Sequence, residues 1–282
     1  MLTMMVGALF GLTLVQQTDT VIPVRPDARL QVSGLGGEVV IRTWNRNELR
    51  VVADHSSRDR IEITARGTYV KVEAKTRMGV PRQVDYNITI PATMDVELGG
   101  THMDIDVEGV RGTVSVETVQ GDVRVVGGSR FITAHSVQGD VEVIGARGRV
   151  DAQSVNGEVT VFDAVGDIRA ETVNGEIRLE RITSPSVEGA TVNGEIVYDG
   201  TIQDNGRYWF NTHNGDLVVS VPRNANVTVS VSTFNGEFES DFPVTLTGTR
   251  GKRFNFTLGG GSARLELESF GGTIRLVRPE SR

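Results

Sequence analysis

The side chains that could do chemistry in this chain recur in register instead of gathering in one motif. A carboxylate occupies the same place of a repeated phrase seven times, at Asp122, Asp140, Glu158, Glu176, Glu195, Asp216 and Glu237. Carboxylates stacked at strand spacing repel one another, so water, salt, nearby arginines or a bound cation must screen them. Calcium suits such oxygen ligands, but the GGxGxD pattern of calcium-binding β-rolls does not occur. We therefore interpret this acidic column as solvated turn carboxylates and predict no metal site.

The sequence contains no motif that is typical of a catalytic site. The four histidines have no shared place in the repeat and no metal-ligand spacing: His55, His102, His135 and His213. No GxSxG motif or dinucleotide fingerprint occurs, and the glycine run 259–261 lacks the lysine of a phosphate loop. We predict no catalytic residue, no cofactor and no enzyme activity. One alternative stays open, because adjacent coils of a solenoid can gather acids and bases into a glycan-cleaving groove.

One twelve-residue phrase positions these side chains. It reads apolar, any, apolar, any, Ser or Thr, Val, Asn or Gln, Gly, Asp or Glu, Val or Ile, any, apolar, and it is clearest in Val150–Val161 and Ile168–Leu179. Its central glycines recur at a nearly constant spacing, at Gly121, Gly139, Gly157, Gly175 and Gly194. Apolar residues alternate with other residues on both sides of each glycine, which predicts two half-buried strands in every repeat. In the second copy we expect the apolar side chains to point inward and Arg169, Glu171 and Arg178 to face water.

Two architectures fit strands of this length. A meander would use each Asn-Gly as a hairpin turn, whereas a solenoid would use it as the corner of a coil and stack like residues on like, about 4.8 Å apart. Whole phrases repeat, including their polar positions, and only stacking of equivalent corners gains from that identity. The sequence therefore predicts an all-β solenoid, similar to a β-helix, with about 18–21 residues per coil and almost no helix in the mature chain.

Three further columns of the phrase have structural explanations. The Ser or Thr of each copy forms a hydroxyl column, whose side chains can hydrogen-bond backbone groups that the corner leaves unpaired. A row of threonines could also present a flat surface to a ligand such as ice. Stacked amides can hydrogen-bond along their column and tolerate the left-handed conformation, and positive φ is the simplest reason for the glycines. We predict a structural turn ladder of Gly121, Gly139, Gly157, Gly175, Gly194, Gly215 and Gly236 with Asn156, Asn174, Asn193, Asn214 and Asn235.

Composition narrows the class of protein further. The 36 acidic and 29 basic residues leave a formal charge of −7 without any lysine or arginine run, which argues against a nucleic-acid partner. The 33 glycines suit many short strands with tight turns. No cysteine is present, so disulfides, thiolate metal sites, cysteine catalysis and a lipid-bearing cysteine are excluded.

The chain divides into a leader and one repeat domain. The apolar run Met4–Val15 has the length of a signal-peptide core and is short for a bilayer span, although a buried first strand is the alternative. We predict a signal peptide over 1–19 and a single solenoid domain over 20–282. Within it we expect irregular coils over 20–110, the regular array over 111–240 and further coils over 241–282. No later segment resembles a membrane span.

The chain resembles a bacterial family of adhesin-like β-strand-repeat envelope proteins, domain of unknown function 4097. The residues that carry the resemblance are Leu30–Trp44, the YNITIP of Tyr86–Pro91, the TVNGEI copies, the SDFPV of Ser240–Val244, and Leu258–Leu276. The resemblance implies a β-solenoid on the cell envelope or outside the cell. It implies no active site, so no functional residue transfers from the family.

The sequence predicts the function of the protein less directly than its fold. We expect an exported, monomeric, non-catalytic binding module that is periplasmic, on the cell surface or secreted, with an envelope protein or a glycan as its partner. The alternatives are a structural or signalling accessory of the envelope and a glycan-degrading enzyme. Exposed aromatic side chains gathered on one face would favour a glycan. Carboxylates with perturbed pKa values in a groove would favour the enzyme, and an evenly charged surface would favour the accessory.

Overall fold

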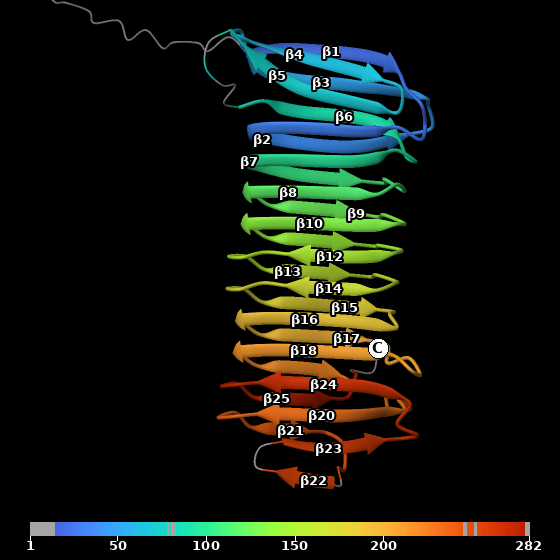
Figure 1. Ribbon diagram of the computed structural model, residues 1–282, viewed down its shortest axis with the longest axis vertical. Helices are drawn as coiled ribbons and strands as arrows, with labels where there is room; N and C mark the ends of the chain where they lie inside the picture. Colours follow the sequence, from blue (N-terminus) through green and yellow to red (C-terminus); the bar gives the residue numbers. More distant parts are fainter. Residues whose placement is uncertain (1–14, 78, 80–82, 245–246, 251–252, 280–282) are drawn as a thin grey trace, which may run out of the picture.

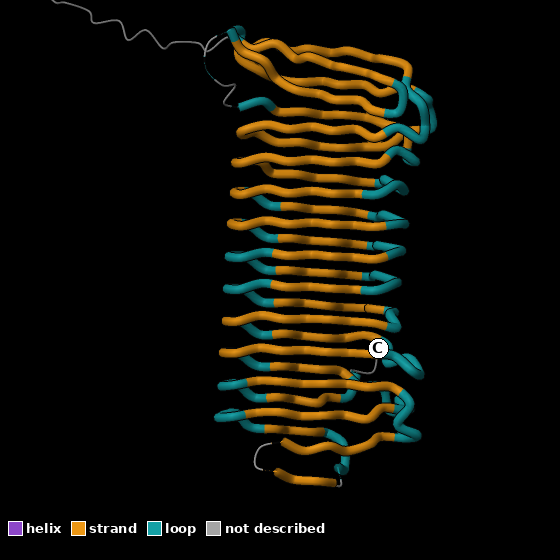
Figure 2. Tube along the Cα trace, viewed as in Figure 1, coloured by secondary structure: helices purple, strands orange, loops and turns teal. Residues whose placement is uncertain are grey.

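The fold is an elongated stack of strands in which every described element is a strand or a turn (Figures 1 and 2). The structure is a computed structural model that describes residues 15–77, 79, 83–244, 247–250 and 253–279. No helix occurs among these residues. Most of the predicted signal peptide lies outside them, and its last residues, Val15–Asp19, belong to the first strand, β1 (Val15–Pro23). The predicted all-β class is confirmed.

The middle of the stack is a regular solenoid with two strands per coil. Its strands are β8 (Val114–Gln120), β9 (Val123–Val126), β10 (Phe131–Gln138), β11 (Val141–Ile144), β12 (Arg149–Gln153), β13 (Val159–Phe162), β14 (Ile168–Glu171), β15 (Ile177–Ile182), β16 (Ser186–Asn193), β17 (Ile196–Gly200), β18 (Arg207–Asn214) and β19 (Leu217–Ser220). Even-numbered strands pair in parallel along one face, and odd-numbered strands pair in parallel along the other. A meander would pair neighbours antiparallel, so the predicted solenoid is confirmed.

The core lies between these two faces, which we call the even and the odd face. Ile168, Ala170, Ile177 and Leu179 are fully or almost fully buried, as their alternation predicts. Arg169, Glu171 and Arg178 point outward from the same strands and are partly exposed. Each coil therefore buries two apolar side chains per strand and holds the next coil through its parallel hydrogen bonds.

The N-terminal end departs from chain order. Its further strands are β2 (Arg29–Trp44), β3 (Glu48–Ser56), β4 (Asp59–Arg66), β5 (Tyr69–Thr76), β6 (Asp85–Pro91) and β7 (Asp95–Glu108). Strand β2 lies between the β5–β6 coil and β7, with parallel pairing on both sides. Antiparallel pairing of β1 with β3, β3 with β6 and β4 with β5 then closes this end of the stack (Figure 1). Irregular pairing of this kind protects an edge against further strand addition.

The C-terminal end also departs from chain order. Its strands are β20 (Val227–Thr233), β21 (Phe238–Ser240), β22 (Thr247–Arg250), β23 (Arg253–Leu258), β24 (Ala263–Ser269) and β25 (Ile274–Val277). The last coil in sequence, β24–β25, is inserted between β18–β19 and β20–β21, and Figure 1 shows β24 directly below β18. Strand β23 pairs antiparallel with β20, and β22 pairs antiparallel with β23 and forms the end. The segment that loses the repeat pattern is therefore a cap.

Large aromatic residues fill the core at the C-terminal side of the array, where the coils become longer. The rings of Tyr198 and Phe210 lie 5.1 Å apart, and Tyr208 packs on the same cluster. The Tyr208 hydroxyl donates to the carbonyl of Ser184 at 2.7 Å. Burial raises the pKa of Tyr198 and Tyr208. Glycine at position 189 makes room for Phe210, because a Cβ there would lie 2.9 Å from the ring. This packing supports β18 from within.

Candidate functional site

The hydroxyl column is buried and points inward at the glycine corner. In each coil from β8 to β18 its Ser or Thr is at most 5% exposed. Thr172 donates to the carbonyl of Gly157 at 3.0 Å, and the same bond runs from Ser136 to Gly121 and from Thr212 to Gly194. Each hydroxyl thus satisfies a corner carbonyl of the coil before it. A surface that is buried in this way cannot present hydroxyls to ice.

The glycine column is explained by the close approach of the backbone of the preceding coil, and only in part by positive φ. Positive φ occurs at Gly121 (137°) and Gly139 (157°), and the expectation is wrong for the later members of the array. A Cβ on Gly175 would lie 2.0 Å from the Gly157 carbonyl oxygen, the same atom that accepts from Thr172. The Ser or Thr and the Gly of the phrase are therefore coupled, because the hydroxyl needs a carbonyl that any side chain would cover.

The amide column forms a hydrogen-bonded ladder on the exposed edge of the same corner. The side chain of Asn174 donates to Asn156 at 2.9 Å, Asn193 donates to Asn174 at 2.8 Å, and Asn214 donates to Asn193 at 2.9 Å. Among the residues that the structure describes, none of these amides has the left-handed conformation we expected. The inserted coil carries Gly271 at this place, and Asn235 follows on its far side.

The acidic column has a structural role that sequence reasoning missed. At two neighbouring corners where its member is aspartate, one carboxylate oxygen accepts the backbone N–H of the equivalent residue in the next coil. Asp122 accepts from Asp140 at 2.9 Å, and Asp140 accepts from Glu158 at 2.8 Å. The sequence did carry a signal for this hydrogen bond, namely Asp instead of Glu at these corners. A short side chain is well placed to reach a nearby backbone amide.

The glutamates in the middle of the column lie close to arginine. Arg178 contacts Glu176 and lies 3.7 Å from Glu158. Burial raises the pKa of Glu176; Arg178 opposes this shift, and the carboxylates of Glu158 and Glu195 reinforce it. Within the described part of the chain, no three His, Cys, Asp or Glu side chains are arranged to hold a metal ion.

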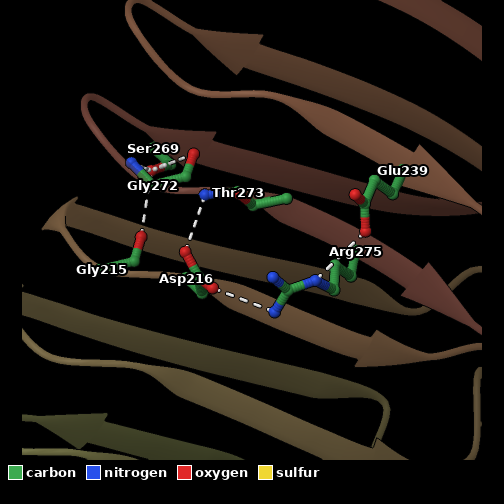
Figure 3. Close-up of polar contacts among 7 residues, drawn as sticks. All are labelled: Gly215, Asp216, Glu239, Ser269, Gly272, Thr273 and Arg275. Atoms are coloured by element: carbon green, nitrogen blue, oxygen red, sulfur yellow. Dashed lines mark hydrogen bonds and ion pairs between the residues drawn. The ribbon is translucent and has the colours of Figure 1, made fainter.

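Polar contacts fasten the inserted coil to both neighbours (Figure 3). Asp216 accepts from the backbone of Thr273 at 2.8 Å. Arg275 binds Asp216 at 2.9 Å and Glu239 at 3.2 Å, so it joins the coils above and below. Ser269 donates to the carbonyl of Gly215 at 3.2 Å. These are the corner contacts of the regular array, made here between segments that lie far apart in the sequence.

An exposed apolar column runs along the glycine corner, at the Val position of the phrase. Its apolar members are between 39% and 62% exposed: Val119, Val137, Val155, Val173, Val192, Phe270 and Phe234. His213 takes this place between Val192 and Phe270. The rings of His213 and Phe270 stack at 4.6 Å, and those of Phe270 and Phe234 stack at 4.9 Å. The column is therefore aliphatic in the array and aromatic in the last three coils.

Two hollows lie on the even face, and the first of them lies beside these rings. One, of about 290 Å³, is lined by the His213–Phe270–Phe234 stack together with Asn211, Glu268, Ser232 and Arg253. The other, of about 400 Å³, surrounds Trp209 and is lined by Glu188, Glu266, Arg207 and Arg264. Trp209 and Asn211 point outward from β18, and each lines one of the two hollows. We call this band, from Trp209 to Phe234 across β18, β24 and β20, the aromatic face.

The remaining histidines do not join this face. His55 is buried and hydrogen-bonds Thr18 at 2.8 Å and the carbonyl of Ser56 at 2.9 Å, which ties β1 to β3. His102 lies in register with Gln120, in the place of the amide column. His135 lies 3.7 Å from Asp151 on the even face of the array.

A third hollow, of about 730 Å³, lies on the odd face near the opposite corner. Val197, Val218 and Val277 give it an apolar floor. Ser220 also lines it, and its hydroxyl is buried and has no hydrogen-bond partner among the described residues. Of the described residues that line it, only Tyr198 is aromatic, and that ring belongs to the core.

The fold and these surfaces define a β-solenoid repeat protein with two broad faces. The chain belongs to the Toastrack DUF4097 family, whose model matches residues 28–277. No curated protein matches it significantly. No helix in the described part of the chain is long and apolar enough to cross a membrane.

Solved structures that match the chain are distant in sequence. A "putative adhesin" from Bacteroides fragilis is 11% identical, with 93% of this chain and 97% of that chain covered and a TM-score of 0.46. A "putative adhesin" from Parabacteroides distasonis is 10% identical over the same shares, with a TM-score of 0.44. A "putative lipid binding protein" from Parabacteroides distasonis is 11% identical over the same shares, with a TM-score of 0.43.

Proposed function

We propose that this chain is an exported, non-catalytic binding module of the cell envelope, with the aromatic face as its binding surface. One observation carries the proposal: exposed aromatic rings and two hollows are gathered on three neighbouring coils. Elsewhere in the described part of the chain, the exposed rings of Tyr69 and Phe131 stand alone, as single apolar side chains do on many soluble proteins. Clustered rings beside hollows are typical of a binding surface.

The chemistry of the other columns supports a binding protein over an enzyme. Hydroxyl, glycine and aspartate positions are engaged in corner contacts, so the residues that repeat are used for stability. Glu176, the carboxyl of the acidic column whose pKa is raised by burial, is paired with Arg178. A structural or signalling accessory of the envelope is expected to have an evenly charged surface. The aromatic face differs from such a surface and therefore favours the binding module.

The test is capture of envelope material by the purified mature domain. Cell-envelope fractions of the bacterium that encodes the chain are passed over immobilised protein, and the double variant Trp209→Ala, Phe270→Ala is compared with the control Phe162→Ala. Phe162 is an outward, half-buried aromatic residue on the odd face of the array. We expect the control to capture as much as the wild type and the double variant to lose most of the signal. Equal capture by all three proteins would contradict the proposal.

A further inference from the structure

We infer that the ligand of the aromatic face is an uncharged saccharide chain that lies across β18, β24 and β20, from Trp209 to the Phe270–Phe234 stack. This inference rests on the proposed binding function and adds the chemical class of the ligand. Sugar rings have one apolar C–H face and a rim of hydroxyls. A site for such a ring needs an aromatic surface with hydrogen-bond donors and acceptors beside it.

The Trp209 hollow has this composition. Trp209 projects from β18 between Glu188 on one neighbouring strand and Glu266 on the other, in direct register. Arg207 and Arg264 line the same hollow. The carboxylates can accept hydrogen bonds from sugar hydroxyls, and the guanidinium groups can donate to hydroxyl or ring oxygens. Because carboxylates and guanidinium groups both line the hollow around the indole, a ring stacked on Trp209 would find both kinds of partner.

The second hollow repeats the arrangement at the corner. The Asn211 side chain donates to Glu268 at 3.2 Å, and Arg253 donates to Ser232 at 3.1 Å. Both pairs lie beside the exposed rings of Phe270 and Phe234. Asn211 lies midway between Trp209 and His213 on the same strand, so the two hollows follow one another across the sheet. At about 3.3 Å per residue, Trp209 and His213 are separated by roughly 13 Å, which suits a short linear oligosaccharide better than a single ring.

Local charge favours a neutral ligand. The two hollows are lined by three arginines and three glutamates, Arg207, Arg253, Arg264, Glu188, Glu266 and Glu268. Their formal charges cancel, whereas the whole chain carries −7. A polyanion would gain no net attraction here and would meet the field of the rest of the protein. These charged side chains also interrupt the band of rings, which does not suit the continuous apolar centre of a protein interface.

The experiment measures binding of defined neutral tetrasaccharides, cellotetraose and chitotetraose, to the purified mature domain by titration calorimetry. Three variants are compared: Trp209→Ala, Trp209→Phe and the control Phe162→Ala, each first shown by circular dichroism to keep the wild-type spectrum. For a tetrasaccharide that binds, we expect at least a tenfold loss of affinity for Trp209→Ala, a smaller loss for Trp209→Phe, which keeps a ring, and no change for Phe162→Ala. Equal losses in Trp209→Ala and Phe162→Ala would overturn the inference.

A second arm separates the ligand class from the binding function, and it decides the question if neither tetrasaccharide binds. Envelope fractions are oxidised with periodate, which cleaves the vicinal diols of sugars and leaves the polypeptide backbone whole, and capture is measured again. Loss of capture after oxidation, with retention by a mock-treated fraction, supports a saccharide. Undiminished capture after oxidation, together with no binding of chitotetraose, whose internal residues lack vicinal diols, overturns the saccharide inference and leaves the binding function standing. Absence of capture from untreated fractions would instead contradict the binding function itself.

Discussion

The regular array and the last three coils are built on the same phrase but differ on their outer surface. In the array the outward residues of the sheets form ion pairs, such as Arg124 with Glu142 at 2.9 Å. In the last coils outward places hold Trp209, Phe270 and Phe234. The corner contacts are the same in both regions, since Ser269 and Asp216 repeat the bonds of the array.

The two regions also differ in how the chain reaches its place. The array grows by adding each coil to the one before it, whereas β24–β25 fills a gap between two earlier coils. The coil β20–β21 therefore has no direct strand partner in β18–β19 and depends on the C-terminal segment. The aromatic face is assembled only when this segment is in place, because Phe270 stacks between His213 and Phe234. The recurring residues of the phrase therefore maintain the solenoid, while departures from the phrase mark the proposed binding surface.

The largest effect should come from a charge placed inside the array. Val159 is fully buried and Thr160, its neighbour in sequence, is outward. We expect Val159→Asp to lower the free energy of unfolding by about 4 kcal/mol, because a carboxylate would lie unpaired between coils. The control Thr160→Asp should change it by about 0.5 kcal/mol or less. Urea unfolding followed by circular dichroism measures both, and similar losses in the two variants would mean that the inward and outward faces are wrongly assigned.

A methyl group at the glycine corner should have the next largest effect, and it separates the two explanations of the glycine column. The Cβ of Gly175→Ala would lie 2.0 Å from the Gly157 carbonyl oxygen, whereas a Cβ on Gly271 has no atom closer than 3.6 Å. Overpacking of this kind costs about 1–3 kcal/mol. We expect that loss for Gly175→Ala and little change for Gly271→Ala in thermal melts. A Gly175→Ala protein as stable as the wild type would contradict the coupling of glycine to the hydroxyl column.

Removal of one buried hydroxyl should cost less. Thr172→Val keeps the shape of the side chain and leaves the Gly157 carbonyl without its donor, which we expect to cost about 1–2 kcal/mol. Thr172→Ser keeps the donor and should recover much of that loss. Both variants lie outside the aromatic face, so capture of envelope material should stay at the wild-type level. Loss of capture at temperatures where Thr172→Val is folded would contradict the division of the molecule into a stabilising array and a binding end.

Much of the fold could be predicted from the sequence because a repeat multiplies weak signals. Alternation around each glycine identified the buried residues, and the identity of whole phrases favoured stacked coils over hairpins. Stacking also brings the Asn and the Ser or Thr of successive coils close enough to form their hydrogen bonds. The cause of the glycine column was not visible, because close approach depends on how far the next coil lies, and periodicity alone does not give that distance.

The place of the last coil and the aromatic face could not be predicted for a different reason. Every copy of the phrase has the pattern to pair with any other, so nothing in Leu265–Leu276 states which two coils it joins. The aromatic face consists of residues from positions 209 to 270 that become neighbours only through this insertion. One signal was available: phenylalanine replaces valine at 234 and 270, where five earlier copies carry valine.

The smallest predicted effect concerns Glu176 and depends on pH. Because the folded protein raises the pKa of this carboxyl above 4.5, ionisation costs stability in the folded state. That cost is absent at pH values well below 4.5, where the group is protonated whether the chain is folded or not, and it grows as the pH rises through the folded pKa. We expect Glu176→Gln to melt at a slightly higher temperature than the wild type at pH 7, with the difference shrinking as the pH falls toward 4.5. Arg178 still has Glu158 and Glu180 within 4 Å in the variant.

Loss of one carboxylate on the even face is the matched control. It tests whether the pH-dependent change in melting temperature comes from the acidic column. Glu117 is exposed on β8, away from the stacked carboxylates, so Glu117→Gln should shift the melting temperature less at pH 7. A variant at position 176 that is less stable than the wild type at neutral pH would mean that the contact with Arg178 outweighs burial and the repulsion from Glu158 and Glu195. The acidic column would then stabilise the array as its aspartates do. Glu176 would then no longer mark a place where the repeat works against its own stability.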